Sequence, residues 1–266
     1  MVDKSEKFSW LVRLGYFARG IVYLLLGYIA LSTAGKAEDG QAAVFDLLQD
    51  IPLGTLILYL VAIGLLAYAA FKAIDAASDI ENHGDDAKGR MKRVGSAASA
   101  VAHLVLAWTA YQFATGEKQQ SGEGDGGSRE TASSLLTWEI GPFVLGIVGI
   151  GFLVGAAMQA KSAWTADFMK HVGGGAPSYV RPIGQAGHAA RAIVFLLIGW
   201  SLLRGAWLTQ SGEVKDLGDA VVALSGAGIL YSLVAVGLIF FGLFSMIVAR
   251  YRIIPDIGSG NLKPHI

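Results

Sequence analysis

Two arginines lie inside apolar stretches of the chain and are the first residues whose type could support chemistry. Arg19 is followed four residues later by Tyr23 and eight residues later by a glycine, and Arg191 repeats this spacing with Phe195. On a helix, positions i, i+4 and i+8 share one face. A charge inside a membrane-type segment is costly, so it marks either a functional site or a side chain whose head reaches the membrane surface. One hypothesis is therefore snorkelling. The sharper one is a basic pocket for a lipid phosphate or another anion, which His188, one turn before Arg191, could join.

Catalytic and metal-binding patterns are missing from the sequence. Cysteine is absent, which excludes thiolate chemistry and disulfides. Paired carboxylates and a nucleophile with a nearby base are not found in the apolar stretches, and His83, His171 and His265 do not have the spacing of metal ligands. We therefore expect no catalytic residues, no metal and no cofactor, and we expect that the protein is not an enzyme. The formal net charge is zero, so no global field argues for a nucleic-acid partner.

Six long apolar segments must position these residues. The chain has 266 residues, of which 53% are hydrophobic and 16% charged, and its mean hydropathy is +0.50. About 20 apolar residues are needed for a helix to cross a hydrocarbon layer of about 30 Å. Nearly charge-free segments of this kind occupy residues 14–34, 53–71, 94–114, 142–159, 189–203 (extendable to 183–208) and 229–249. The sequence predicts an all-α membrane protein that forms one membrane domain over residues 1–266.

Most lysines and arginines outside these segments lie on one side of the predicted membrane. They fall in the N-terminal segment, in the second and fourth connections and in the C-terminal tail. Because cationic loops resist translocation, this side is predicted to be cytoplasmic, together with both termini. The glycine-rich connection 115–128 then faces the exterior.

An internal repeat divides the chain into residues 11–76, 91–164 and 180–252. The segment GYFARGIVYLLLGY, which contains Arg19, aligns with GHAARAIVFLLIGW, which contains Arg191, and more weakly with GSAASAVAHLVLAW. In the weaker copy Ser99 replaces the arginine and His103 replaces Tyr23. We expect both to be buried polar groups, with His103 hydrogen-bonded to a neighbouring helix rather than relaying protons, because no acidic residue lies at its depth.

The second helix of each repeat also carries a shared pattern. Gly64, Gly151 and Gly237 occupy equivalent positions, and Gly151 forms a GxxxG motif with Gly155 that we interpret as a packing motif. The outer connections each place an alanine four residues before a leucine, which predicts a short amphipathic helix: Ala43/Leu47, Ala132/Leu136 and Ala220/Leu224. Two helices per repeat keep the copies in one orientation, so we expect three hairpins with approximate threefold pseudo-symmetry.

The three copies of the glycine, alanine-arginine and leucine pattern resemble the bacterial membrane family known as domain of unknown function 1206. The resemblance covers residues from about Leu11 to Arg252. It implies six spans in three repeats and a place in the bacterial plasma membrane, and it implies no activity. Ser99 departs from the arginine of the other two copies.

Two functions from different classes remain open. The first is a non-enzymatic module that binds membrane lipids, with anionic head groups as candidate ligands, or a partner protein. The second is a small-solute or ion transporter or channel with a path along the pseudo-threefold axis. The scarcity of acidic and amide groups in the apolar segments favours the first, because a polar path needs groups that replace water around its cargo.

Overall fold

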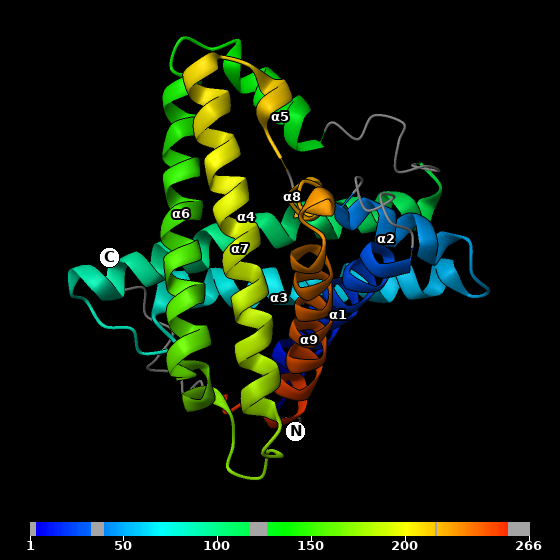
Figure 1. The fold of residues 1–266 in the computed structure, drawn as a ribbon. Coiled ribbons are helices and arrows are strands. Elements are labelled where there is room, and N and C mark those ends of the chain that lie inside the picture. Colours follow the sequence, from blue (N-terminus) through cyan, green and yellow to red (C-terminus); the bar gives the residue numbers. More distant parts are fainter. Residues whose placement is uncertain (1–3, 33–39, 118–126, 216, 255–266) are drawn as a thin grey trace.

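The computed structural model describes residues 4–32, 40–117, 127–215 and 217–254, and in them the fold is all-helical (Figure 1). Its long helices are α1 (Lys4–Ser32), α3 (Gly54–Ser78), α4 (Ala87–Thr115), α6 (Gly141–Thr165), α7 (Val180–Leu208) and α9 (Ile229–Tyr251). All six are long and apolar enough to cross a membrane. The predicted fold class, with six spans in three repeats, is confirmed.

The helices extend beyond the apolar segments from which they were predicted. α3 continues seven residues past Phe71 and ends at Ser78, where Asp79 adopts the left-handed conformation. α4 begins earlier than predicted because the Asp86 carboxylate accepts a hydrogen bond of 2.8 Å from the Gly89 backbone N–H. The long α7 settles the uncertain ends of the fifth segment at Val180 and Leu208. The added turns bring charged residues of α3 into the folded core, which the apolar segments alone did not indicate.

Five pairs of long helices in the described part of the chain have extensive contacts, within repeats and between them. Three pairs join neighbouring repeats, α3 with α4, α6 with α7 and α9 with α1, and two more pairs join helices of one repeat, α1 with α3 and α7 with α9. In the second repeat, α4 and α6 lack a packed interface. Figure 1 shows α6 and α7 running together, with α3 and α4 running across them. The helices therefore pack as hairpins, but the ring of three repeats is open between α4 and α6.

The equivalent glycines of the three repeats show how the second repeat differs from the other two. A Cβ atom added at Gly64 would lie 2.4 Å from the Ala18 Cβ atom, and one added at Gly237 would lie 2.4 Å from the Ala190 Cβ atom. These glycines thus allow α3 to approach α1 and α9 to approach α7 closely. The equivalent Gly151 has nothing within 4 Å of such an atom. The second repeat thus has the glycine at the equivalent position, but no helix of the described residues packs against it.

The GxxxG interpretation of α6 needs a related correction. Gly149, not Gly151, makes the close helix approach: an added Cβ at Gly149 would lie 3.1 Å from the Gly199 carbonyl oxygen of α7. A Cβ atom added at Gly155 would lie 3.1 Å from the Phe195 ring. The spacing of Gly151 and Gly155 indicates a packing motif but does not specify which side of α6 contacts α7. That side is determined by the packing of the whole helix.

The short helices predicted in the outer connections are present. They are α2 (Gly40–Gln49), α5 (Gly127–Leu136) and α8 (Leu217–Val222). Among the described side chains of α2, Phe45 and Leu48 are buried and Leu47 is exposed, so the predicted apolar face is displaced around the helix. Phe45 packs against Phe113 of α4, with ring centroids 6.0 Å apart. α2 contacts α8, and α5 contacts the turn after α7, so these outer connections gather at one end of the molecule.

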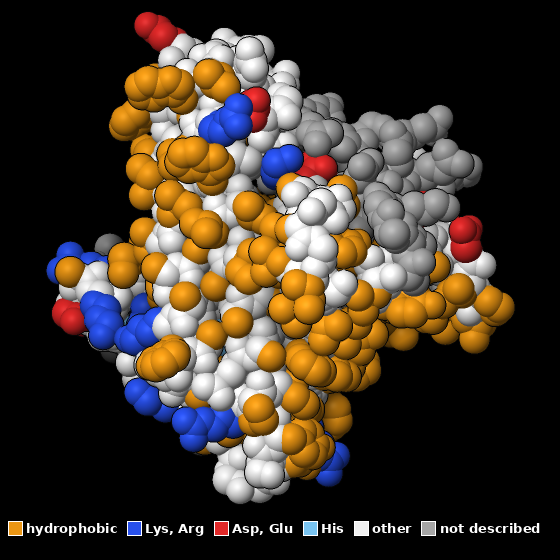
Figure 2. Space-filling model, in the orientation of Figure 1, with side chains coloured by type: hydrophobic (Ala, Val, Ile, Leu, Met, Phe, Trp, Pro, Cys, Tyr) orange, Lys and Arg blue, Asp and Glu red, His pale blue; other side chains and the backbone are white. Residues whose placement is uncertain are grey.

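The outer surface of the helices is largely apolar. Figure 2 shows hydrophobic side chains along the long helices, with many of the basic side chains of this face toward the end where Figure 1 marks the N-terminus. Every tryptophan is exposed: Trp10, Trp108, Trp138, Trp164, Trp200 and Trp207. Exposed tryptophans near helix ends are typical of a membrane interface.

Candidate functional site

Arg19 is buried on α1, and its guanidinium group is held by α3 and α9. Its side chain is only 8% exposed. One terminal nitrogen donates a hydrogen bond to the Tyr68 hydroxyl, and the other donates to the Ser245 hydroxyl at 3.1 Å. The Tyr16 and Tyr68 rings lie 4.6 and 4.8 Å from its central carbon. Arg19 therefore does not snorkel to lipid but faces the protein interior.

Arg191 is held mainly by aromatic rings. Its central carbon lies 4.4 Å from the centroid of Phe241, 4.7 Å from that of Phe195 and 5.3 Å from that of Tyr23. Arg19 also contacts the Phe241 ring, and its central carbon lies 5.0 Å from the ring centroid. The two arginines, 172 positions apart in sequence, are thus brought to one ring of α9. Cation–π contacts offset part of the cost of burying both cations.

Both arginines line a cavity of about 170 Å³. Its wall comes from α1, α3, α7 and α9, with side chains from the segment after α6 and from the end of α9. Its charged and histidine side chains include Arg19, Arg191, Lys72, Glu81, His188 and Arg252. His188 therefore joins the arginines, as the sequence predicted.

The cations of this cavity differ in how their charge is balanced. Lys72 lies 3.2 Å from the Glu81 carboxylate, and Arg252 pairs with the same carboxylate. For Arg19 and Arg191 the structure gives hydroxyl and aromatic contacts and no carboxylate within ion-pair distance among the described residues. A buried cation without an anionic partner is unfavourable. The cavity thus carries positive charge that an anion would neutralise.

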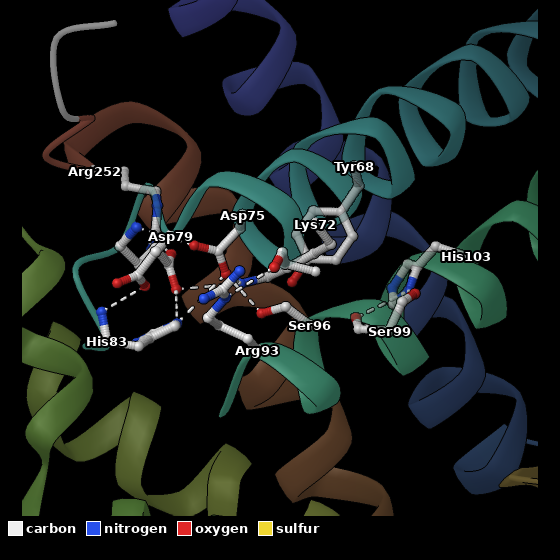
Figure 3. A network of polar contacts seen from close by, with 12 residues as sticks. Tyr68, Lys72, Asp75, Asp79, His83, Arg93, Ser96, Ser99, His103 and Arg252 are labelled. Atoms are coloured by element: carbon white, nitrogen blue, oxygen red, sulfur yellow. Dashed lines mark hydrogen bonds and ion pairs between the residues drawn. The ribbon is translucent and has the colours of Figure 1, made fainter. Parts of the chain in front are cut away.

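Asp75 organises a polar network (Figure 3) whose members Lys72 and Glu81 line the cavity. The fully buried carboxylate of Asp75 accepts hydrogen bonds from the Ser96 hydroxyl at 2.6 Å and from the Glu81 backbone N–H at 2.9 Å. The Lys72 ammonium lies 3.6 Å from it. Asp75 therefore joins α3, the α3–α4 connection and the start of α4, and it fixes Lys72 beside the cavity.

The connection between the second and third repeats is joined to the end of the third repeat. The Gly173 backbone N–H donates to the Tyr251 carbonyl at 2.7 Å, and the Ile253 N–H donates to the His171 carbonyl at 2.9 Å. Burial, followed by the nearby charge of Lys72, lowers the pKa of His171, so this histidine favours its neutral form. The segment after α6 is thereby tied to the end of α9 beside Arg252.

Asp75, Glu81 and His83 place possible metal-ligand atoms within 4.8 Å of one another. Lys72 and Arg252 already occupy the carboxylates, so a metal ion would have to displace one of these cations. The donor set is better described as an ion-pair network than as a metal centre.

The family model described as Domain of Unknown Function (DUF1206) matches residues 14–79, 94–166 and 186–252. This chain belongs to the DUF1206 family. It is also 32% identical over 265 residues to the uncharacterized protein YxxB of Bacillus subtilis (strain 168), with 94% of each chain covered. No solved structure matches the chain. The three matched segments agree with the internal repeat and with the six long helices, so the protein is a multi-span membrane protein of this family.

The DUF1206 repeat explains why the cavity lies where it does. Tyr16 and His188 occupy equivalent positions in the first and third repeats, as do Arg19 and Arg191. Tyr68 and Phe241 are also equivalent, each four residues after the packing glycine of its helix. The cavity is thus built mainly from matching positions of two repeats, while α4 and α6 do not line it. This cavity is therefore not a site that all three repeats share on one axis.

The other candidates lie near the cavity without lining it. Tyr23 packs behind Arg191 and against Phe241, with ring centroids of Tyr23 and Phe241 4.8 Å apart. His103 is half-buried, and its Nδ1 atom lies 2.7 Å from the Ser99 carbonyl of its own helix. The expected hydrogen bond to a neighbouring helix is therefore wrong; the contact with α3 is the packing of the His103 ring on Tyr68, at 4.5 Å between centroids. Ser99 is also only half-buried.

Sequence reasoning missed the acidic part of the site. The second predicted apolar segment ends at Phe71, so Asp75 lies outside it and the sequence gives no indication that Asp75 is on a buried helix face. The spacing of Lys72 and Asp75, three residues apart, is the local signal that could have indicated a charged pair on one face of α3. The pairing of Glu81 with Arg252 spans 171 residues and has no local signal.

Proposed function

We propose that this protein is a non-enzymatic, multi-pass protein of the bacterial plasma membrane that binds an anionic group in the Arg19/Arg191 cavity. The candidate ligands are the phosphate of a membrane lipid head group and a free oxyanion. One observation carries the proposal: Arg19, which is buried, and Arg191, which is partly buried, line one cavity, and no carboxylate of the described residues lies within ion-pair distance of either. A bound anion would neutralise them, and a guanidinium can hold an oxyanion through two parallel hydrogen bonds.

The proposed orientation places the cavity near the cytoplasmic surface, with both termini inside. The positions of basic residues support it, because Lys72 and Arg252 line the cavity and Arg93 donates hydrogen bonds to the last turn of α3. Anionic lipids of the inner leaflet are attracted to basic pockets at this level.

The side chains inside the helix bundle favour an anion-binding protein over a transporter or channel. Beyond the arginines, the helices fill the core with buried apolar side chains, among them Leu26, Val194, Ile198, Val234 and Leu238. A transport path would need polar groups at this depth. The transporter alternative would gain support from a conformation with a polar lumen through this layer.

The test compares two double substitutions in protein purified in detergent. In Arg19→Lys/Arg191→Lys the charge is kept but the forked guanidinium is lost. We expect at least about tenfold weaker binding of inorganic phosphate and sulfate, and loss of co-purifying anionic lipid by native mass spectrometry, because each charge-assisted hydrogen bond contributes about 1.5–3 kcal/mol.

The matched control is Arg204→Lys/Arg250→Lys. Both arginines are exposed and lie on α7 and α9, the helices that also supply Arg191 and Phe241. This variant should keep the affinities and the lipid complement of the unmodified protein. Equal binding by all three proteins, or no binding by any of them, would refute an anion site at the arginines.

A further inference from the structure

His188 is the part of the cavity whose chemistry is most constrained. Its ring stacks on Phe168, with centroids 4.8 Å apart and planes inclined by 17°. Phe241 and Phe244 meet it at centroid distances of 5.4 and 5.6 Å. These contacts fix the plane of the imidazole, so its two nitrogens have fixed directions.

The hydrogen bond of His188 to α6 determines where its proton lies. The Nδ1 atom contacts the Oε1 atom of Gln159. Because an amide oxygen only accepts hydrogen bonds, Nδ1 must carry the proton. A second proton on Nε2 would add a third cation beside Arg19 and Arg191 in a buried site, which is unfavourable. His188 is therefore a neutral ring whose Nε2 atom is a hydrogen-bond acceptor.

This acceptor has no partner in the folded protein. Among the described side chains, the buried polar atoms without a hydrogen bond are Nε of Arg19, Nε of Arg191 and Nε2 of His188. All three residues line the same cavity. Buried polar groups are normally satisfied, so this set indicates a ligand. The arginines require negatively charged oxygens, and His188 requires a donor.

We propose that the cavity selects an oxyanion that carries a proton: inorganic hydrogen phosphate, or a phosphate monoester bound with one P–OH group. This inference rests on the proposed anion-binding function. The charged oxygens bind Arg19 and Arg191, and the P–OH group donates to Nε2 of His188. Sulfate and phosphodiesters present only hydrogen-bond acceptors at neutral pH. Either ligand would therefore place an acceptor oxygen against Nε2 of His188, which is itself an acceptor. Gln159 is a positioning residue, because it holds the tautomer without lining the cavity.

The first experiment measures phosphate and sulfate affinities of the detergent-purified protein by titration calorimetry at pH 6, where a phosphate monoester retains much of its second proton. We expect phosphate to bind about tenfold or more tightly than sulfate, because an unmatched buried acceptor is penalised. In His188→Phe this ratio should fall toward one. His103→Gln is the control, since His103 lies outside the cavity and its loss should leave the ratio unchanged.

Variants of Gln159 test the tautomer directly. Gln159→Leu frees Nδ1, so the proton can move to Nε2 and the preference for phosphate should drop. Gln159→Asn keeps a neutral amide acceptor on this side of the ring and should retain more of the preference than Gln159→Leu does. A role of Gln159 in stability alone would not make the preference for phosphate depend on an acceptor at this position.

The second experiment separates the two sources of the ligand. The protein is placed in nanodiscs that contain phosphatidic acid, a monoester, or phosphatidylglycerol, a diester, and retained lipid is measured by native mass spectrometry. Preferential retention of phosphatidic acid assigns a lipid head group, and a preference seen only with inorganic phosphate assigns the free anion. Arginine-dependent binding of phosphate and sulfate with equal affinity overturns this inference alone, whereas absence of any arginine-dependent binding overturns the proposed function as well.

Discussion

At the scale of single residues, the cavity combines two ways of holding a buried cation. Lys72 and Arg252 are balanced by the two carboxylates of Asp75 and Glu81. Arg19 and Arg191 contact hydroxyl groups and aromatic faces instead. Ion pairs cancel charge within the protein, whereas cation–π contacts reduce the cost of burial and leave the charge available. This difference separates the cations that stabilise the fold from those that can bind a ligand.

The most sensitive residue outside the cavity wall should be Asp75. Asp75→Asn removes the charge that faces Lys72 and His83 in a fully buried position. We expect a loss of about 3–5 kcal/mol in the free energy of unfolding, because removing one member of a buried ion pair leaves the other uncompensated. The measurement is denaturant unfolding of the purified protein in mixed micelles. Asp85→Asn, on an exposed carboxylate of the same connection, should change stability little, and a comparable loss there would argue against the buried network.

At the scale of elements, the packing between helices depends on equivalent glycines that are used differently. Gly64 and Gly237 sit against alanines of α1 and α7, but Gly151 faces open space. The same sequence position therefore has two structural roles. The repeat pattern in the sequence does not distinguish them.

Alanine substitutions at these three positions should separate the roles. Gly64→Ala and Gly237→Ala should each destabilise the protein by about 1–3 kcal/mol, since the new Cβ atom overlaps a neighbouring helix. Gly151→Ala should be neutral or stabilising by up to about 1 kcal/mol, because alanine favours a helix more than glycine does. Thermal unfolding in detergent provides the measurement. Destabilisation by Gly151→Ala as large as at the other two positions would mean that α6 packs against another helix through this face.

At the scale of the whole molecule, the connections divide between two ends. α2, α5 and α8 lie at one end, and the connection after α3, the segment after α6 and the end of α9 meet at the other. This division is what six crossings of a membrane require. The basic residues at the second end favour a cytoplasmic location for it.

Labelling of single cysteines should establish the orientation, since the chain has no cysteine of its own. Gln210→Cys, in the exposed turn after α7, should react with an impermeant maleimide on intact cells, whereas Ser78→Cys should react only after the membrane is opened. Gln210 is preferred to Ser121 of the long outer connection, because Ser121 lies outside the described residues. Labelling of Ser78→Cys alone on intact cells would show the reverse orientation.

The sequence alone determined the six helices, the threefold repeat and the place of Arg19, Arg191 and His188 on equivalent turns. These features depend on apolar length and on the spacing of residue types, which are local properties of the chain. The short helices of the outer connections followed from the same kind of pattern, although the buried face of α2 did not.

Only the tertiary structure decided which helices meet. That α4 pairs with α3 and not with α6, that Asp75 is buried, and that Arg252 reaches Glu81 depend on contacts between residues far apart in sequence. Such contacts are set by the combined fit of whole helix faces, and equivalent glycines in three repeats do not specify which of them find a partner. The neutral state of His188 also depends on contacts between distant residues. Gln159 belongs to α6 of the second repeat and Phe168 to the segment after α6, and only the folded chain brings both beside His188.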